Sequence, residues 1–480
     1  MPWKAPNPIE IYKMLPKTNC GKCGEANCMA FAVKLINFEA ELDQCTPLFE
    51  EGYRESYQKI KALVAPPVRE IALKSPQRAV KIGGEYVLCR HELKYMNPTA
   101  IAIDVDDTMD KDTLIKRLKA IENFSYEYVG RKLKLDLVAL RSTSNDPKQY
   151  MKATQTVIEN CTLPLILCSQ DPRIIEAGLS VLNGKHKPLI YAATKDNWRE
   201  MADLAKTYNS ALTIASPGDL DTLISLTKTL TEDVGIEDVA LDPGCFTGIG
   251  GLSYTIKAYT QLRYKAMNEG YKYASYPLIG TPISIWTKPY EDPVQKMMWE
   301  TILSTIMMTR YADALIMHSL EGWSLLPLVM WRFNLYTDPR KPVAVETGLR
   351  VIGNPDENSP VFVTSNYALT YSIVSNDIQK GGLNAWLIVI DTEGLAVDVS
   401  VAAKKFVGDK VMEVIKESGL EEKVKNKILI IPGKAARVSG DIEEVTKWKV
   451  VVGPMDSSEI PSFIKKIWTP EKIKEILEEG

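Results

Sequence analysis

The sequence predicts an α/β protein built from a small cysteine-rich N-terminal domain, a TIM (β/α)8 barrel and a C-terminal doubly wound domain. Three observations lead to this prediction. Four of the eight cysteines lie close together near the N-terminus, apolar strand-like segments alternate with helical segments in the middle, and a shorter α/β series follows. The expected boundaries are 1–60 for the first domain, 61–78 for a linker, 79–330 for the barrel and 331–480 for the last domain.

The composition is that of an ordinary globular protein, with 45% hydrophobic and 25% charged residues in 480. Because 58 Lys and Arg balance 61 Asp and Glu, no basic field is present that would attract nucleic acid or an anionic membrane. The start, "MPWKAPNPIE", lacks a signal-peptide core, and no apolar run is long enough to span a bilayer. We therefore expect a cytoplasmic protein, in which clustered cysteines indicate metal binding or catalysis rather than disulfides.

The clustered cysteines are spaced Cys20-x2-Cys23-x4-Cys28-x16-Cys45. Glycines beside the first three allow a tight loop, and apolar residues at helical spacing predict a helix packed over the site. Four inward-facing thiolates fit either a tetrahedral zinc ion or a 4Fe–4S cluster. Three ligands on one loop favour the iron–sulfur cluster, because zinc sites usually use two CxxC pairs. The other four cysteines are scattered and are expected to be mostly structural: Cys89, Cys161, Cys168 and Cys245.

A proline-bearing linker, "KALVAPPVREIALKSPQ", is expected after the cluster, over residues 61–77. The next segment, "AVKIGGEYVLCRHEL", predicts a strand, a turn at Gly83-Gly84 and a second strand. Eight barrel strands are then predicted at "TAIAIDV", "LDLVAL", "LPLILC", "KPLIYAA", "SALTIAS", "VALDP", "YPLIGTP" and "DALIMHS". Helices are expected between them, for example over 111–121, 197–208 and 292–311. Eight β/α units are typical of a TIM barrel, and an open doubly wound sheet is the alternative.

Polar residues follow several of the predicted barrel strands and should lie at the C-terminal rim, where barrels carry their sites. They are Asp104, Asp106, Arg141, Asp171, Asp242 and His318. Carboxylates at this rim could bind a pterin, or the barrel could serve as a scaffold that docks a partner. For His318, a structural hydrogen-bonded role is the simpler interpretation.

The C-terminal series predicts four parallel strands at "PVAVET", "AWLIVID", "KILIIPG" and "KVVVGP", with a helix over "NYALTYSIVSNDIQK". A doubly wound sheet binds ligands beyond the carboxyl ends of its strands. The residues expected there are small, with hydroxyls and glycines, and would let a large flat ligand approach the backbone. They occupy 347–348, 364–370, 391–394 and 432–436.

Three motifs carry a resemblance that covers essentially the whole chain: "EIYKMLPKTNCGKCGEANCMAFA", "TSNYALTYSIVSNDI" and "IIPGKAARVSGDIEE". In this order they resemble the large subunit of the corrinoid iron–sulfur protein, whose archaeal counterpart is the gamma subunit of the acetyl-CoA decarbonylase/synthase complex. The resemblance implies a methyl-group carrier and a methyltransferase component. The cobalt of a corrinoid would accept a methyl from a methyl-tetrahydropterin and pass it to the nickel site of acetyl-CoA synthase, or the reverse.

The resemblance also implies cofactors, partners and site residues. A 4Fe–4S cluster on Cys20, Cys23, Cys28 and Cys45 would reduce inactive Co(II) to Co(I). The implied partners are a homologous small, delta-type barrel subunit, the nickel subunit of acetyl-CoA synthase, and methyl-tetrahydropterin or its methyltransferase. The corrinoid would contact Thr347, Gly348, Thr364, Asn366, Leu369, Thr370, Gly394, Pro432, Gly433, Ala435 and Ala436. Thr370 would face the lower side of cobalt, and Lys434 is longer than the neutral residue expected in "IPGKAA".

The chain has three histidines, His91, His186 and His318, and none lies in the predicted C-terminal domain. Many cobalamin proteins place a histidine below cobalt through a D-x-H-x-x-G motif, which is absent from this domain. We therefore expect a base-off corrinoid. A strong axial donor stabilises higher oxidation states, so its absence brings the Co(II)/Co(I) couple within reach of a low-potential cluster.

Two alternatives need no corrinoid: a ferredoxin-fused barrel oxidoreductase, and a zinc-stapled assembly scaffold. The residues leave open which tetrahydropterin is used, the direction of acetyl-CoA metabolism, whether corrinoid is retained without the partner, and whether the barrel binds a ligand. Since one cobalt would have to meet several partners in turn, mobile linkers are expected near 61–77 and 330–342.

Overall fold

A computed structural model describes residues 6–182, 184–248, 250–287 and 291–478. The chain forms two compact units. The first comprises Met1–Phe124 and Lys134–Tyr336, and the second comprises Ser125–Leu133 and Thr337–Gly480. The second unit therefore contains a short piece of chain that comes from within the barrel sequence. Among the described residues, none of the helices is both long and apolar enough to cross a membrane.

The N-terminal part of the first unit consists of α1 (Pro8–Met14), α2 (Cys28–Ile36) and α3 (Arg54–Val64), with short 3-10 turns between α2 and α3. Side-chain amides cap the first two helices, because Asn7 accepts from the Ile9 N–H and Asn27 from the Ala30 N–H. A small core fixes the three helices around the buried side chains of Ile11, Phe31, Leu48 and Ile60.

An antiparallel hairpin of β1 (Glu70–Lys74) and β2 (Ala79–Gly83) follows. The predicted linker over 61–78 is therefore wrong in part, because it contains the end of α3 and the whole of β1. The strand predicted after Gly83-Gly84 is also not formed. The apolar alternation of Ile71 and Leu73 belongs to β1, which packs with Ile82 against the interior of the barrel.

The barrel consists of eight parallel strands in the order β10-β9-β8-β7-β6-β3-β12-β11. A bridge between Leu241 and Leu278 joins the two ends of this sheet and closes it. All eight predicted strands are confirmed, and closure excludes the open sheet. Their bounds are β3 Ala100–Asp106, β6 Leu137–Arg141, β7 Leu165–Cys168, β8 Leu189–Ala193, β9 Ala211–Ala215, β10 Val239–Asp242, β11 Ile279–Gly280 and β12 Ala314–Met317.

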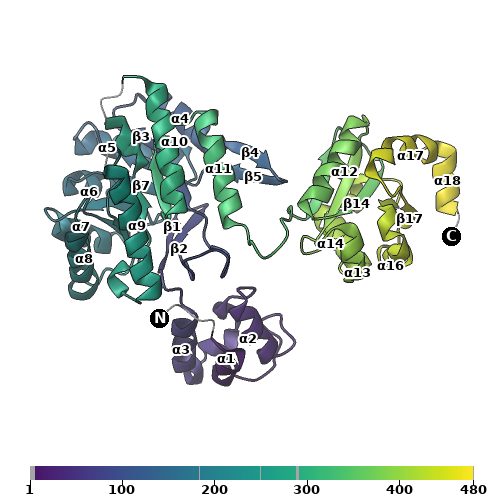
Figure 1. Cartoon of the computed structure of the whole chain (residues 1–480), viewed down its shortest axis with the longest axis horizontal. Helices are drawn as coiled ribbons and strands as arrows, with labels where there is room; N and C mark the ends of the chain where they lie inside the picture. The colour runs from purple at the N-terminus through teal and green to yellow at the C-terminus, as the bar shows by residue number, and fades with distance from the viewer. Residues whose placement is uncertain (1–5, 183, 249, 288–290, 479–480) are drawn as a thin grey trace. The chain divides into compact units, whose positions relative to one another are not determined.

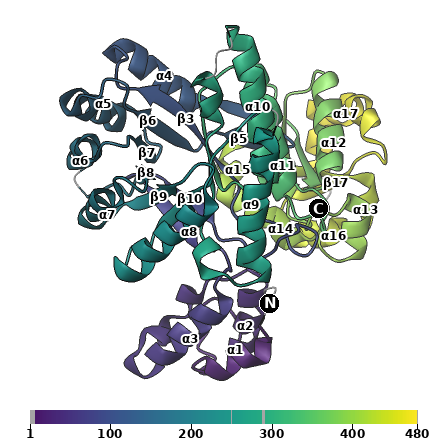
Figure 2. The ribbon, with the colours of Figure 1, turned by 60° about the vertical axis from the view of Figure 1, so that its left-hand side comes forward.

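Helices alternate with the strands and lie around them in both views (Figures 1 and 2). They are α4 Lys111–Asn123, α5 Pro147–Asn160, α6 Pro172–Ser180, α7 Trp198–Thr207, α8 Leu220–Lys228, α9 Gly251–Asn268, α10 Pro293–Thr309 and α11 Gly322–Tyr336. A 3-10 segment, η6 (Pro282–Thr287), follows β11. The predicted linker over 330–342 is wrong at its start, because α11 continues to Tyr336.

A hairpin of β4 (Ser125–Tyr128) and β5 (Arg131–Lys134) is inserted between α4 and β6. Its turn residues, Val129 and Gly130, both have left-handed backbone angles, with φ of 51° and 66°. Two positive φ values suit the type I′ turn that joins paired strands, and glycine is favoured there. Val129 packs against the core of the second unit.

The second unit has a five-stranded sheet in the order β13-β15-β14-β16-β17. Four strands are parallel, β14 (Val361–Ser365), β15 (Ala385–Ile390), β16 (Ile428–Ile431) and β17 (Lys449–Val452), while β13 (Gly348–Ile352) pairs antiparallel with β15. The helices are α12 Ala368–Lys380, α13 Val397–Ala402, α14 Gly408–Ser418, α15 Leu420–Lys423, α16 Ser439–Thr446, α17 Ile460–Ile467 and α18 Pro470–Glu478.

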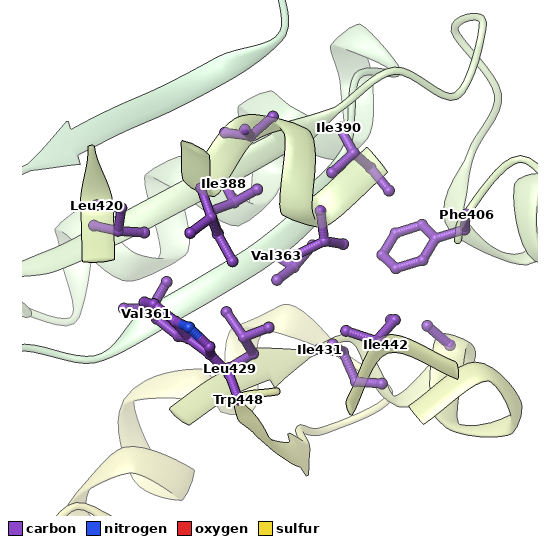
Figure 3. Packing of buried hydrophobic residues seen from close by; sticks show 14 of the residues in the cluster. Val361, Val363, Ile388, Ile390, Phe406, Leu420, Leu429, Ile431, Ile442 and Trp448 are labelled. Atoms are coloured by element: carbon purple, nitrogen blue, oxygen red, sulfur yellow. The ribbon is translucent and has the colours of Figure 1, made fainter. Parts of the chain in front are cut away.

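The number of parallel strands in this unit was predicted correctly, but the first was placed wrongly. "PVAVET" contributes only a single bridge, between Ala344 and Tyr367, whereas "VFVTS" forms β14. β14 is buried along its whole length in the middle of the sheet, and apolar β-branched residues such as its valines are typical of a strand buried on both faces. Figure 3 shows Val361 and Val363 in the core with side chains from β15 and β16, such as Ile388 and Ile431.

Candidate functional site

The strand order of the second unit creates a crevice at the carboxyl ends of β14 and β16. The chain leaves β14 toward β15 on one side, and β16 leads to β17 on the other, so the two loops diverge. A cavity of about 440 Å³ lies there, lined among others by Thr370 of α12 and Pro432 after β16. This is the position at which doubly wound sheets hold their ligands.

The end of β14 carries two buried hydroxyls without hydrogen bonds to any described residue, those of Thr364 and Ser365. Leaving a buried hydroxyl unpaired costs about 1–3 kcal/mol. Neither residue is among those that line the crevice, but polar atoms of this kind at the end of a strand that borders it fit a ligand that offers hydrogen-bonding groups. The donor chemistry is therefore compatible with a macrocycle carrying amide side chains.

Two large apolar side chains of the crevice wall face solvent. Ile373 of α12 is 47% exposed and Met455 is 68% exposed, and both line the crevice. Exposed apolar groups gathered round one opening indicate a surface that is covered in the functional state. Such a rim suits a broad, flat and largely apolar ligand.

Two of the eleven predicted corrinoid contacts, Thr370 and Pro432, line the cavity. Asn366 instead braces the rim, because its Oδ1 accepts from the Thr392 N–H at 3.0 Å and from the Gly394 N–H at 3.0 Å. The side chain of Ala435 lies in the hydrophobic core, and Leu369 lines a different pocket, beside the β4–β5 hairpin. Thr347 and Gly348 begin the antiparallel edge strand at the same end of the sheet.

Several lining residues were not predicted. Ile373, Ala396, Val397 and Met455 contribute apolar wall. Lys434, which falls within the predicted stretch 432–436, also lines the cavity, with its ammonium 3.7 Å from Asp398. The spacing of Leu369 and Ile373 was a clue in the sequence. They lie one helical turn apart, so the two apolar side chains share a helix face that is not the buried one. Met455 follows β17. Its loop lies at the crevice because β17 is next to β16 in the sheet, which the sequence did not reveal.

The four clustered cysteines lie on the loop before α2 and on the segment that follows it. Gly21 and Gly24 have φ of 68° and 85°, which lets the loop turn sharply. The Asn19 side chain accepts from the Cys28 N–H at 2.9 Å and fixes the end of the loop. Cys20 is exposed, whereas Cys28 and Cys45 are buried.

The pKa values show that these thiols are neighbours. Burial, with smaller contributions from the charges of Cys23, Cys28 and Cys20, raises the pKa of Cys45 to about 11. The Lys22 backbone N–H lowers the pKa of Cys20. Within the described residues, no three His, Cys, Asp or Glu side chains are arranged to hold a metal ion. The four thiols are the donor set that a 4Fe–4S cluster requires, and its positive charge would favour their ionised form.

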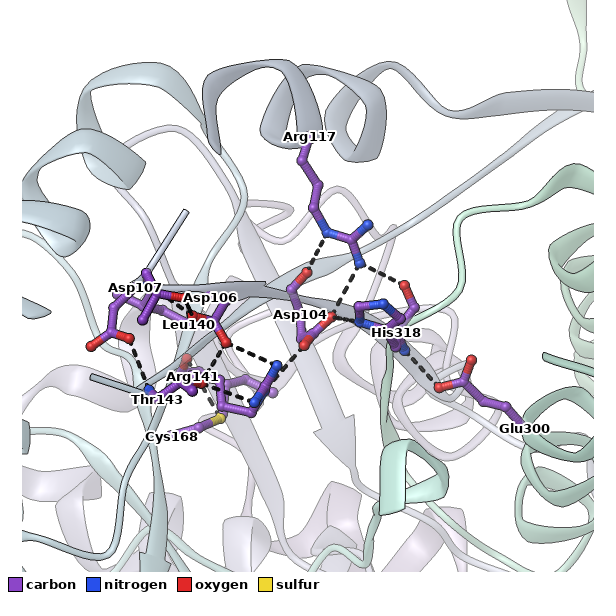
Figure 4. Close-up of polar contacts among 12 residues, drawn as sticks. Asp104, Asp106, Asp107, Arg117, Leu140, Arg141, Thr143, Cys168, Glu300 and His318 are labelled. Carbon is purple, nitrogen blue, oxygen red and sulfur yellow. Dashed lines mark hydrogen bonds and ion pairs between the residues drawn. The ribbon is translucent and has the colours of Figure 1, made fainter. Parts of the chain in front are cut away.

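The C-terminal rim of the barrel brings four of the six predicted polar residues into one network (Figure 4). Asp104 accepts from His318 Nδ1 at 2.6 Å, from Arg117 at 3.1 Å and from Arg141 at 3.2 Å. Arg141 also pairs with Asp106 at 3.0 Å. Burial raises the pKa of Asp104, but these three partners outweigh it and hold the pKa below its usual value.

The other two residues lie apart from this network. Asp242 is completely buried and accepts from the Tyr191 hydroxyl at 2.6 Å and from the Gly244 N–H at 2.8 Å. Asp171 caps α6 by accepting from the Arg173 N–H, and it pairs with the Arg173 side chain. Asp171 is therefore a helix cap, because an Asp-Pro pair is well suited to a helix start.

A cavity of about 350 Å³ opens between these groups and is lined by residues from most of the barrel strands. Cys168 and Cys245 both line it. Burial raises the pKa of Cys168 to about 12, which agrees with its expected inert character. The cavity walls also include Tyr191, Phe246 and Ile283.

Comparison with known proteins identifies the family. A family model described as "CO dehydrogenase/acetyl-CoA synthase delta subunit" matches residues 70–464. The chain belongs to this family. A second model, described as "Putative Fe-S cluster", matches residues 15–47 and contains all four clustered cysteines.

Full-length relatives of the family are named as gamma subunits of the acetyl-CoA decarbonylase/synthase complex. The gamma 2 subunit of Methanosarcina thermophila is 44% identical over 471 residues, which cover 98% of this chain and 100% of the relative. The gamma subunit of Methanothermobacter thermautotrophicus is 42% identical over 459 residues, covering 96% and 98%. The resemblance inferred from the three motifs is confirmed at the level of the family.

Among solved structures, dihydropteroate synthase from Thermus thermophilus is similar to 55% of this chain and 99% of its own. The sequence identity is 16% and the TM-score 0.37.

Proposed function

We propose that this protein is the methyl-carrying subunit of an acetyl-CoA decarbonylase/synthase complex. In this proposal it holds a base-off corrinoid over the carboxyl ends of β14 and β16, and a 4Fe–4S cluster on Cys20, Cys23, Cys28 and Cys45. The observation that carries the proposal is the apolar-rimmed crevice at the switch point, in a unit without a single histidine. The bound corrinoid would supply a cobalt that accepts and donates a methyl group, and the cluster would supply the electron that restores Co(I).

The residues around the crevice have distinct roles in this proposal. Thr370 would help to hold the corrinoid with a weakly donating hydroxyl in place of a strong ligand, and the unpaired Thr364 and Ser365 hydroxyls would be available for hydrogen bonds to it. Ile373 and Met455 exclude water from the ring. Lys434 is kept beside Asp398, so its length does not place an unpaired ammonium in the pocket.

The partners proposed for this chain are a homologous delta-type barrel subunit, the nickel subunit of acetyl-CoA synthase, and methyl-tetrahydropterin or its methyltransferase. Two findings support them. The relatives are named as subunits of a complex, and the family model that matches most of this chain is described as a delta subunit. A partner built on the same fold is therefore expected.

Metal analysis of the chain, produced anaerobically together with its delta-type partner, tests the proposal. We expect about one cobalt and four irons per chain and a visible spectrum of the base-off type. Cys45→Ser should lose most of the iron and keep the cobalt, because the two cofactors lie in separate parts of the chain. Cys161→Ser, a buried cysteine outside the cluster, is the matched control and should keep both.

The other outcomes select the alternatives. Iron without cobalt in the intact pair would contradict the carrier function and favour a ferredoxin-fused oxidoreductase. One zinc, no colour and no EPR signal after reduction would favour the assembly scaffold. A spectrum with histidine bound to cobalt would contradict the base-off assignment.

A further inference from the structure

His318 is held in a fixed position beside the barrel cavity, next to Asp104, which lines the cavity. It is the residue directly after β12, and Ile316, two positions earlier, lines the cavity. Side chains of a strand alternate, so residues two apart point to the same side. His318 directly follows the strand, and its partner Asp104 lines the cavity, so His318 adjoins the cavity at the C-terminal rim where barrels carry their chemistry.

Four groups from four elements hold this residue. The Glu300 carboxylate of α10 accepts from the His318 N–H at 2.6 Å and from the Ser319 N–H at 2.9 Å. Arg117 of α4 donates to the His318 carbonyl at 2.6 Å. Asp104 of β3 lies 2.6 Å from Nδ1 (Figure 4). The Trp286 ring of η6 contacts the imidazole, with ring centroids 4.3 Å apart. A residue that only fills space does not need hydrogen bonds to its backbone N–H and carbonyl in addition to contacts with its ring.

The contacts also define the state of the imidazole. Asp104 has a pKa below its usual value, so its carboxylate is ionised and can only accept, which makes Nδ1 the donor. Nε2 has no hydrogen bond to any described residue, and the side chain is 30% exposed. Nε2 is thus the atom that can give or take a proton beside the cavity. The charged groups around the ring are Asp104, Glu300, Arg117 and Arg141, two of each sign.

The proposed reaction needs such a proton. When a methyl group leaves the ring nitrogen of an N-methylated tetrahydropterin as a cation, the electron pair of the C–N bond stays on nitrogen. An amide-type anion is a very poor leaving group in water at neutral pH, so a proton must reach this nitrogen as the bond breaks. In the reverse direction the same proton must be removed.

We propose that the 350 Å³ cavity binds the ring of the methylated tetrahydropterin and that His318 Nε2 donates the proton to its departing nitrogen. This inference rests on the proposed methyl-carrier function and deepens it by assigning the donor site. Asp104 is the positioning residue, since it accepts from Nδ1 and thereby orients the imidazole. Tyr191, Phe246 and Ile283 provide apolar walls for a flat bicyclic ring, and Thr281 and Ser284 provide hydroxyls at its edge.

Comparing two methyl donors distinguishes proton donation by His318 from a structural role of this residue. The co-expressed holoprotein, reduced to Co(I), is mixed either with the methylated tetrahydropterin or with methyl iodide, whose leaving iodide needs no proton. His318→Gln should slow transfer from the pterin by about 10²- to 10⁴-fold, the usual contribution of a general acid. It should leave the reaction with methyl iodide unchanged. His186→Gln, the same change at a histidine near the opposite end of the barrel strands, should alter neither rate.

A second readout does not depend on transfer. Calorimetric titration with the unmethylated tetrahydropterin, in two buffers of different ionisation enthalpy, should show proton exchange in the wild type and none in His318→Gln. Asp104→Asn should keep proton exchange but shift the pH profile of transfer, because the imidazole loses its orienting carboxylate.

Equal pterin rates in wild type and His318→Gln would overturn the inference, as would a wild-type holoprotein that reacts with methyl iodide but not with the pterin. Failure of wild-type holoprotein to react even with methyl iodide would contradict the carrier function itself.

Discussion

Thr370 is the residue that we propose sets the chemistry of the cobalt without binding it strongly. It lies in the first turn of α12 and lines the crevice, whereas its neighbour Leu369 lines the pocket beside the hairpin. Adjacent helical residues point about 100° apart, so only one of the two faces the crevice. The sequence motif contained both residues and could not separate them.

Placing an imidazole at position 370 should remove the proposed advantage of a cobalt without a strong axial donor. In Thr370→His we expect histidine to bind cobalt, with nitrogen splitting in the Co(II) EPR spectrum. Because a strong donor favours Co(II) over Co(I), the midpoint potential should fall by at least about 59 mV, a tenfold change in a one-electron equilibrium. Ser372→His, on an exposed position two residues later, is the control and should change neither. An unchanged spectrum in Thr370→His would contradict the assignment of Thr370 below cobalt.

The β4–β5 hairpin is the element that local sequence patterns did not reveal. Its strands are short and mostly polar, and it packs within the second unit although its sequence lies inside the barrel series. An added Cβ on Gly130 would lie 3.0 Å from Val345 and 3.4 Å from Tyr371 of α12. The hairpin therefore braces the helix that carries Thr370.

Gly130→Val should loosen this brace. The new side chain would crowd Val345 and Tyr371, at a cost of about 1–3 kcal/mol for overpacking. Amide hydrogen exchange in residues 125–134 and in the first turns of α12 should accelerate by about tenfold or more. Gly270→Val is the matched control, since Gly270 has a similar φ of 64° but no atom near its missing Cβ. It should leave exchange in α12 unchanged, and equal effects of the two substitutions would contradict the brace.

At the scale of the whole molecule, the hairpin changes how the second unit is attached. The expectation of mobile linkers near 61–77 and 330–342 assumed one connection between the barrel and the last domain. The chain passes between the two units after Phe124, after Leu133 and after Tyr336. Any motion of the C-terminal domain must therefore move the hairpin with it or release it.

Cutting the chain tests this attachment. A protease site placed at 338–341, in the exposed loop after α11, should allow complete cleavage without separation of the fragments in gel filtration. The hairpin, still joined to the barrel, stays packed in the second unit. Combined with Gly130→Val, cleavage should release the C-terminal fragment, and combined with Gly270→Val it should not. Immediate separation of the cleaved wild type would contradict the attachment.

The sequence by itself determined the eight barrel strands, the four-cysteine spacing, the parallel series at the C-terminus and the absence of histidine from it. These features depend on period, composition and short-range spacing, which act within a few residues along the chain. They were also enough to identify the family, because the three motifs are short and continuous.

Only the tertiary structure decided which of the predicted rim residues act together. His318 contacts Asp104, which is 214 residues away in the sequence. Asp171 does not belong to the rim network, because it caps its own helix. The hairpin joins the second unit, and Met455 reaches the crevice, through sheet order and long-range packing. Contacts between distant residues depend on how whole elements are arranged in space, and local periodicity carries no record of that arrangement.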